Sequence, residues 1–412
     1  MGNRILVVGT YDTKDDELTY LAQVIRAQGG EVLSMDVSVL GDPKAPTDIT
    51  KHQVAAAAGS AIKAVIASGN ENTAMQVMAR GAATLSAKLH GEGAFDGVIV
   101  LGGSMGTDLA LDVCAALPLG VPKYVVSTIS FSPLIPPGRV AADIQMILWA
   151  GGLYGLNSVC KATLSQAAGA VLGAARAANV PDGARPIIAM SGFNSKVVTY
   201  MVALKPALEA RGFEVAVFHG TGMGGRALES LAAQGTFAAV LDLSPQEVAN
   251  HLFGSAISAG DDRLTNAGLR GTPQIVSIGC LDLVDLVGWQ PLPAPFADTP
   301  AHAHNRLLTT VLQTPDQRRE VAREVCRKLA SATGPAVFIL PVKGGHCWDV
   351  PGGPLCDPAG LAAFCDEMRA ACPQGVALIE LDCHINDPAF AAAALSVVDS
   401  WIADGTLPQG PA

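Results

Sequence analysis

Aromatic residues are scarce in this chain of 412 residues, where they make up 5% of the sequence. Runs of basic residues are also missing, and the net charge at pH 7 is −10. A basic surface that would bind nucleic acid is therefore not expected, and the surplus of acidic residues favours solubility. No apolar run reaches the roughly 18 residues that a membrane-spanning helix needs. The sequence thus predicts neither a nucleic-acid partner nor a membrane partner.

The nine cysteines are scattered along the chain, and none forms a Cys-x-x-Cys pair. Their spacing indicates neither a disulfide framework nor a zinc ribbon. Near the N-terminus the chain enters an apolar segment, Ile5–Val8, without the charged and apolar regions of a signal peptide. We therefore expect a soluble cytoplasmic protein with reduced thiols.

The amino-acid composition is dominated by alanine, valine, leucine and 44 glycines. Apolar segments of strand length alternate with helical patterns, which predicts an α/β fold with parallel sheets covered by helices. We expect two Rossmann-like doubly wound domains, residues 1–182 and 183–412, because residues 179–186 have the composition of a linker. Ligands in such domains bind beyond the C-terminal ends of the strands, so a cleft between the domains is the predicted site.

The residue pattern also predicts the individual elements. Strands are expected at 187–190, 215–218 and 336–340, among others. Helices are expected, among others, at 53–67, 143–148, 303–331 and 388–403.

Two glycine-rich junctions each join an apolar strand to a helix. The first contains Gly102, Gly103, Ser104, Gly106 and Thr107, and the second contains Thr221, Gly222, Gly224, Gly225 and Arg226. Glycine lets the backbone N–H groups approach a ligand closely, and the helix N-terminus adds partial positive charge. Each junction therefore suits a phosphate or carboxylate. The alternative is a tight structural turn, since neither junction matches the dinucleotide fingerprint or the P-loop.

Asp12, Thr13 and Lys14 follow the first predicted strand. A lysine in this place pairs with phosphate oxygens, and an aspartate holds a divalent ion or a ribose hydroxyl. The alternative is a polar helix entry in which Asp12 or Thr13 is the N-cap.

Three further residues are candidates for catalysis. His219 lies at the entrance of the second junction, Lys343 opens a polar loop after a strand, and His384 follows the last strand. A histidine beside an anion site is a plausible general acid or base, although a single histidine is more often structural. His346–Cys347 and Cys383–His384 raise a metal or Cys/His nucleophile alternative. Neither pair has established ligand spacing, so no metal site is predicted.

Several motifs in order carry a family resemblance. They are Gly9-Thr-x-Asp12-Thr-Lys14, Leu101-Gly-Gly-Ser-x-Gly-Thr107, Phe218-His-x-Thr-Gly-x-Gly-Gly-Arg226, Ser258-Ala-Gly-x-Asp-Arg263 and His384-Ile-Asn-Asp387. With them the chain resembles the Tm-1-like ATP-binding proteins from about residue 6 to residue 391. The resemblance implies two Rossmann-like domains, binding of ATP with Mg²⁺, and a homodimer.

Three loops depart from the pattern of that family, at residues 127–132, 191–196 and 343–349. In the last loop, Lys343-Gly-Gly-His-Cys-Trp-Asp349 stands where the family usually has Lys-Gly-Val-Ser-x-x-Asp. These changes indicate a divergent branch with a different second ligand.

We favour an ATP- and Mg²⁺-dependent enzyme that acts on a small acidic metabolite in the interdomain cleft. Lys14, Arg226 or Lys343 would contact the phosphates, and His219 or His384 would move a proton. Two alternatives stay open. One is a nucleotide-binding regulator or adaptor without turnover, and the other is an ATP-independent isomerase or hydrolase of an organic acid.

Overall fold

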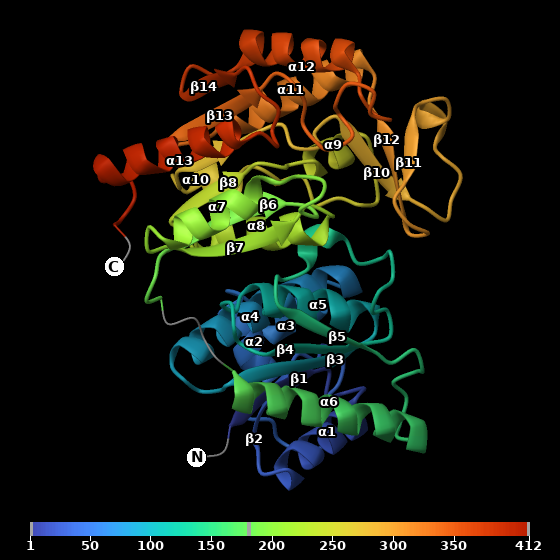
Figure 1. Ribbon diagram of the computed structural model, residues 1–412. Coiled ribbons are helices and arrows are strands. Elements are labelled where there is room, and N and C mark those ends of the chain that lie inside the picture. Colours follow the sequence, from blue (N-terminus) through green and yellow to red (C-terminus); the bar gives the residue numbers. More distant parts are fainter. Residues whose placement is uncertain (1–2, 179–182, 410–412) are drawn as a thin grey trace. The chain divides into compact units, whose positions relative to one another are not determined.

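The computed structural model describes residues 3–178 and 183–409. The chain divides into two compact units, Met1–Asp182 and Gly183–Ala412. Each unit is built of helices on a mainly parallel sheet (Figure 1), which confirms the predicted two-domain α/β fold. Residues 179–182 of the predicted linker lie outside the described residues, and the expected cleft between the domains stays a prediction.

Five parallel strands form the sheet of the first unit, in the order β2-β1-β3-β4-β5. They are β1 (Arg4–Gly9), β2 (Glu31–Asp36), β3 (Gly97–Gly102), β4 (Lys123–Ser127) and β5 (Ile144–Leu148). The strand order reverses between β1 and β3. The C-terminal ends of these two strands therefore form a topological switch point, where doubly wound domains bind their ligands.

Both faces of this sheet are covered by helices. Successive side chains of a strand point to opposite faces, so the consecutive apolar residues of β1 contribute to the core on both sides. Ile5 and Val7 of β1 belong to a core with α1 (Asp15–Ala27) and α6 (Ser158–Ala177). Leu6 and Val8 point to the other face. There they join α2 (Lys51–Ala57), α3 (Ile62–Ala67), α4 (Glu71–Gly91) and α5 (Ser104–Ala115).

The second unit repeats this design with six parallel strands in the order β14-β13-β9-β8-β6-β7. They are β6 (Ile187–Gly192), β7 (Glu214–His219), β8 (Ala239–Asp242), β9 (Gln274–Val276), β13 (Ala336–Pro341) and β14 (Val376–Leu381). On one face the core includes α7 (Tyr200–Glu209) and α13 (Pro388–Ala403). On the other it includes α9 (Glu247–Leu252), α11 (Pro315–Leu329) and α12 (Pro358–Ala371). Helices α8 (Met223–Ala233) and α10 (Asn266–Leu269) complete the unit.

A small antiparallel sheet in the second unit was not expected. Its order is β10-β12-β11, formed by β10 (Leu283–Val287), β11 (Ala301–Ala303) and β12 (Leu308–Leu312). The helix predicted at 303–331 is therefore wrong in its first part. Thr309, Thr310 and Val311 are β-branched and favour a strand. Helix α11 begins only after Thr314, whose capping box with Gln317 marks the true start.

Two other helix predictions are corrected. The helix predicted at 143–148 is replaced by the edge strand β5 at 144–148, because pairing with β4 overrides the weak helical pattern of so short a segment. Residues 53–67 form two helices rather than one, since the chain turns at Gly59 with a φ of 73°. Short 3-10 helices occur at Pro137–Arg139 and Ala294–Phe296.

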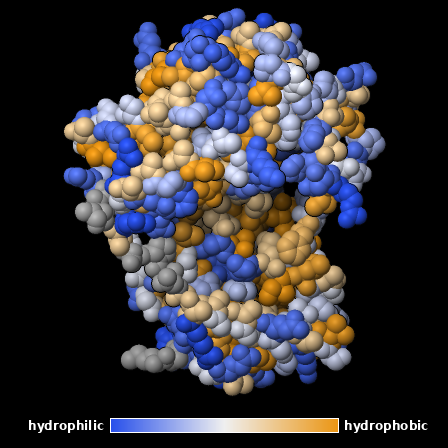
Figure 2. Space-filling view, viewed as in Figure 1, coloured by the Kyte–Doolittle hydropathy of each residue, from blue (hydrophilic) through white to orange (hydrophobic). Residues whose placement is uncertain are grey.

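The surface of the first unit carries several large apolar side chains. Leu40, Ile66, Phe131, Leu134 and Tyr154 are all exposed, and Figure 2 shows hydrophobic residues among the hydrophilic ones on the visible face. Within the described residues, no helix combines the length and the apolar character needed to cross a bilayer.

At Gly102 the backbone of the first unit leaves no space for a side chain. A Cβ atom there would lie 2.5 Å from Cα of Gly106, in the backbone of α5. We expect Gly102→Ala to lower the free energy of unfolding by about 1–3 kcal/mol, seen as a lower urea midpoint. As a control, Gly173→Ala in α6, where a Cβ meets nothing within 4 Å, should raise stability by roughly 0.5–1 kcal/mol. Equal effects of the two variants would contradict this account.

Candidate functional site

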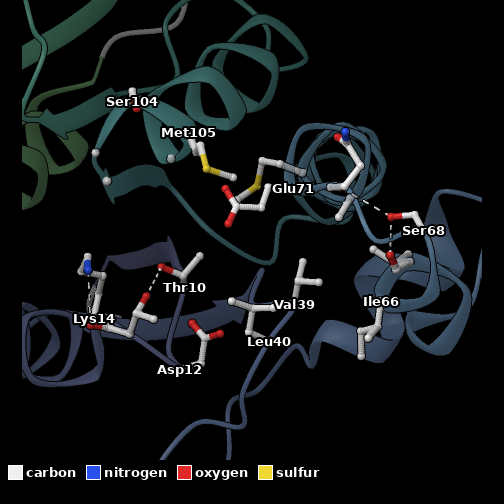
Figure 3. A pocket seen from close by; sticks show the side chains of 18 of the residues that line it. Thr10, Asp12, Lys14, Val39, Leu40, Ile66, Ser68, Glu71, Ser104 and Met105 are labelled. Carbon is white, nitrogen blue, oxygen red and sulfur yellow. Dashed lines mark hydrogen bonds between the residues drawn. The ribbon is translucent and has the colours of Figure 1, made fainter.

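A cavity of about 560 Å³ lies in the first unit, at the C-terminal ends of β1 and β3. Four segments enclose it: the loop after β1, the loop after β2, the turn between α3 and α4, and the glycine junction that opens α5. Figure 3 shows Thr10, Asp12 and Lys14 on one side and Ser104 and Met105 of α5 on another. The cavity is thus built at the switch point that the strand order defines.

Most residues predicted from the two N-terminal motifs line this cavity. They are Asp12, Thr13, Lys14, Gly102, Gly103, Ser104 and Gly106. The two motifs, which lie about ninety residues apart in the sequence, therefore meet at one cavity.

The N-terminus of α5 supplies the donors of the site. Gly103 is the N-cap residue, and no side chain caps the helix. The first N–H with a partner inside the helix belongs to Thr107, which donates to the carbonyl oxygen of Gly103 at 2.8 Å. The N–H groups of Ser104, Met105 and Gly106 precede it in the first turn and border the cavity. Such a helix start favours negative charge.

Lys14 adds a positive charge to the same cavity. Its Nζ donates to the carbonyl oxygen of Thr13 at 3.4 Å, and no carboxylate of the described residues pairs with it. The hydroxyl groups of Thr10 and Thr13 lie 3.0 Å apart beside it. A lysine without an ion-pair partner in a cavity wall is free to bind an anion.

Two carboxylates also line the cavity. Oδ2 of Asp12 accepts the N–H of Gly41 at 3.0 Å, while the buried Oδ1 has no hydrogen-bond partner. Glu71 opens α4, and its carboxylate points into the space between the walls (Figure 3). Oxygen atoms of this kind are the ligands that Mg²⁺ prefers.

Much of the remaining wall is apolar, and Ser68 and Asn70 add polar groups to it. Val39, Leu40, Ile66 and Met105 contribute its apolar part, and Leu40 is 82% exposed. The cavity thus joins a polar end, where α5 and Lys14 lie, to an apolar end.

Buried hydrogen bonds hold the loop after β1 in place. Asp36 at the end of β2 accepts the N–H and the hydroxyl group of Ser38, and the Ser38 oxygen accepts the N–H of Asp12 at 2.9 Å. Burial raises the pKa of Asp36, although these hydrogen bonds partly offset the effect. Asp36 therefore positions Asp12 without lining the cavity itself.

Thr107 acts within the fold and not toward a ligand. It is buried, its hydroxyl group donates to the carbonyl oxygen of Gly103 at 2.7 Å, and it lies 2.6 Å from Oγ of Ser127. It ties α5 to the end of β4. Thr107, for which we predicted a ligand contact, does not line the cavity, and its hydroxyl group already has two partners.

The second glycine junction differs from the first in one decisive contact. Oε1 of Glu247 accepts the N–H of Gly222 at 2.6 Å and the N–H of Gly225 at 3.0 Å. A carboxylate of the chain itself fills the place that we predicted for an external anion. Gly224 lacks a side chain because a Cβ would meet the carbonyl oxygen of His219. Arg226 pairs with Asp262 at 2.5 Å. This junction is thus a structural turn, the alternative that the sequence left open.

Glu247 belongs to a buried charge cluster around Arg263. The guanidinium group, fully buried, contacts Asp242, Glu229 and Glu247, with Nε 2.7 Å from Oε2 of Glu247. Burial raises the pKa of both Glu229 and Glu247. Breaking such a cluster leaves an uncompensated buried charge, so its role is structural.

The three predicted catalytic residues of the second unit do not line one common cavity. His219 and Thr221 line a cavity of only about 50 Å³, and Nδ1 of His219 lies 3.2 Å from the Thr221 hydroxyl group. Burial lowers the pKa of His219, and the nearby His304 lowers it further. Lys343 and His384 line a different cavity, of about 640 Å³.

His384 is held by backbone groups at both ring nitrogens. Nδ1 accepts the N–H of Asn386 at 3.0 Å, and Nε2 lies 3.1 Å from the carbonyl oxygen of His346. One neutral tautomer satisfies both contacts, so the ring has no nitrogen left for proton transfer. Nζ of Lys343 lies 2.9 Å from Oδ2 of Asp382. The proton-transfer role predicted for His384 is therefore not supported.

Sequence reasoning missed Glu71 and the apolar wall. Glu71 follows Asn70, the N-cap of α4, and an acidic residue in a first helical turn is ordinary in any helix. No local signal distinguishes it, because only the packing of α4 beside the switch point brings it to the cavity.

Comparison with known proteins settles the family. A model of the N-terminal domain of the uncharacterised protein family UPF0261 matches residues 3–180, and a model of its C-terminal domain matches residues 185–402. The chain belongs to the UPF0261 family. A UPF0261 protein of Brucella melitensis biotype 1 is 52% identical over 407 residues, which cover 99% of this chain and 97% of the relative.

A plant relative is less similar in sequence but also matches nearly the whole of this chain. The ToMV susceptible protein tm-1(GCR26) of Solanum lycopersicum is 27% identical over 424 residues, which cover 97% of this chain and 55% of the tomato protein. Among solved structures, a pyrethroid hydrolase from Sphingobium faniae JZ-2 aligns with 52% of this chain and 98% of its own. Its identity of 17% and TM-score of 0.25 are too low to carry an argument. Binding of ATP stays a prediction.

The support of the cavity by Asp36 can be tested through pH. Because the pKa of Asp36 is raised in the folded protein, its contribution to stability is present below the unfolded pKa and is lost as pH rises through the folded value. We expect Asp36→Asn to gain stability relative to the parent protein between about pH 4 and about pH 7. Urea midpoints of both proteins across this range measure the difference.

Asp48 is the matched control. Burial opposes its ionisation, but the N–H and hydroxyl group of Ser34 donate to Oδ2 and lower its pKa. The stability that ionised Asp48 contributes is lost as pH falls through the ordinary pKa of an aspartate toward the lower pKa of the folded protein. The difference between Asp48→Asn and the parent should therefore stay constant from about pH 5 to about pH 7. A constant difference for Asp36→Asn as well would contradict the assignment.

Proposed function

We propose that the N-terminal domain binds ATP with Mg²⁺ in the 560 Å³ cavity, and that the chain uses the nucleotide in a reaction on a small acidic metabolite. One observation carries the proposal. An uncapped helix N-terminus and an unpaired lysine lie at one end of a cavity whose other end is apolar. A nucleotide has the same division, with charged phosphates at one end and a flat base at the other.

The phosphates would lie against α5. The first-turn N–H groups of Ser104, Met105 and Gly106 are the donors, and Lys14 adds a full positive charge. Gly102 allows this close approach, since any side chain there would push α5 away from β3. The base would lie against Val39, Leu40 and Ile66, which at present leave apolar surface facing solvent.

The carboxylates explain why a cation belongs to the proposal. Asp12 and Glu71 carry two negative charges against the single positive charge of Lys14, so a bare triphosphate would be repelled. Mg²⁺ neutralises phosphate charge and bridges phosphate oxygens when bound. Oδ1 of Asp12, buried and without a partner, and the Glu71 carboxylate are the groups that would hold it.

A homodimer and a cytoplasmic location belong to the same proposal. The first rests on the resemblance to Tm-1-like ATP-binding proteins. The second agrees with nine cysteines that are all free thiols. The acidic metabolite rests on the sequence pattern alone, because Glu247 already fills the second glycine junction.

A regulator without turnover is the second candidate. The residues that line the nucleotide cavity include neither histidine nor cysteine, which are common general bases and nucleophiles. A protein that only senses the nucleotide needs no such group. An ATP-independent isomerase or hydrolase is the third candidate.

Lys14→Met tests the phosphate contact. We expect isothermal titration calorimetry to show binding of ATP with Mg²⁺ to the parent protein, weakened roughly 10- to 100-fold in the variant because one charged hydrogen bond is lost. Lys88→Met, on α4 outside the cavity, is the control and should bind as the parent does. No binding to the parent would favour the third candidate. Release of phosphate on addition of acidic metabolites would identify an enzyme, and binding without release a regulator.

Glu71→Gln tests the role of the cation. In the parent protein, EDTA should weaken ATP binding strongly, because both carboxylates then face the phosphates. Removing one charge should make binding in EDTA tighter and the gain from Mg²⁺ smaller. Glu92→Gln, at the far end of the same helix, should change neither value. An unchanged response to Mg²⁺ in Glu71→Gln would exclude this carboxylate from the site.

A further inference from the structure

Three potential metal ligands converge in the second unit. Asp282 follows β9, and His346 and Asp349 lie in the loop after β13. One ligand atom from each residue lies within 4.8 Å of the others. Nε2 of His346 is 3.0 Å from Oδ2 of Asp282. The C-terminal ends of neighbouring parallel strands bring these side chains together, since β9 and β13 pair directly.

The cluster is buried and its hydrogen bonding is incomplete. His346 is fully buried, Asp349 is 3% exposed and Asp282 is 9% exposed. Oδ1 of Asp282 has no hydrogen-bond partner. A buried carboxylate oxygen without a donor is costly. Because Asp282 lies beside a histidine and a second carboxylate, this unpartnered oxygen atom indicates that a positively charged partner is missing.

The surrounding charges also lack a cation. Asp282, Asp349 and Asp357 are three carboxylates near one guanidinium group, that of Arg318, which lies 3.6 Å from Asp282 and 3.4 Å from Asp357. With a neutral His346 the group carries two surplus negative charges. One divalent ion would balance them.

Backbone contacts already hold the ligands in place. The N–H of Gly345 donates to Oδ2 of Asp349 at 3.0 Å, and the N–H of Cys280 donates to the carbonyl oxygen of Gly345 at 3.3 Å. The second bond ties the loop after β9 to the loop after β13. Oriented ligands of this kind raise metal affinity.

Two contacts oppose coordination: the hydrogen bond between Nε2 of His346 and Oδ2 of Asp282, which bonds from both atoms to the metal would replace, and a weaker one at Nδ1. Nδ1 of His346 accepts the N–H of Trp348 at 3.3 Å, which places the proton of the neutral ring on Nε2. Coordination through Nε2 moves that proton to Nδ1 and gives up this long hydrogen bond. The loss corresponds to roughly a tenfold reduction in affinity, which is small beside the affinity of a site with three protein ligands.

We infer that Asp282, His346 and Asp349 bind a divalent transition-metal ion in the C-terminal domain. Two carboxylates and one imidazole suit Zn²⁺ or Mn²⁺ better than Mg²⁺ or Ca²⁺, which prefer oxygen ligands alone. Asp349 also lines the cavity of about 640 Å³ that contains Lys343. The cavity gives access to the ion, and three protein ligands leave a position for an oxygen of a carboxylate or phosphate compound.

Cobalt titration of the full-length chain, stripped with EDTA, tests the site. We expect one Co²⁺ per chain with visible d–d absorption, displaced by Zn²⁺. No thiolate-to-metal band should appear in the near ultraviolet, since the ligand set has no cysteine. Asp349→Asn and His346→Asn should weaken uptake by roughly a hundredfold or more.

Two control variants accompany this titration. His302→Asn replaces a histidine whose ring lies 4.9 Å from that of Trp348, outside the cluster, and should bind cobalt as the parent does. Lys14→Met should also bind it normally, which separates this site from the nucleotide proposal. Absence of stoichiometric uptake, a thiolate band, or unchanged uptake by folded ligand variants would overturn the inference. If those variants do not fold, the spectrum of the parent protein still decides.

Discussion

The contact between the end of β3 and the first turn of α5 is the constraint on which the candidate site depends. Gly102 lets the backbone of Gly106 approach within the space that a Cβ would need. The helix therefore begins at the edge of the sheet, and its free N–H groups face the switch point between β1 and β3. Lys14, Asp12 and Glu71 line the same cavity as this helix start.

The two glycine junctions show how one sequence pattern leads to two chemical outcomes. In both, glycines expose N–H groups at the start of a helix. In the first unit these groups border a cavity, whereas in the second a buried carboxylate, Glu247, already binds them. Glu247 follows the next strand, and Arg263 holds its other oxygen. An internal anion with a buried counter-ion stabilises the turn and removes it from ligand binding.

The second unit uses the C-terminal edge of its sheet differently from the first. Much of that edge is filled by internal contacts, including the Arg263 cluster and the backbone bonds of His384. The loops after β9 and β13 nevertheless bring Asp282, His346 and Asp349 together, and they leave Oδ1 of Asp282 without a hydrogen-bond partner. His346 and Asp349 lie in the loop 343–349, which is one of the three loops that depart from the pattern of the Tm-1-like proteins. The small antiparallel sheet follows directly after Asp282, so it belongs to the surroundings of the same group.

The sequence by itself determined the fold class and most helices and strands, and it singled out two motifs that meet at one cavity. Apolar periodicity is a local property, so the helix at 388–403 and the strands around 187–190 and 336–340 could be read from it. Residues 144–148 and 308–312 became strands only through pairing with neighbours. The second glycine junction is filled only because Glu247 reaches it in the folded chain. The Asp282–His346–Asp349 group forms only because β9 pairs with β13. Such contacts join residues far apart in the chain, and no local pattern records them.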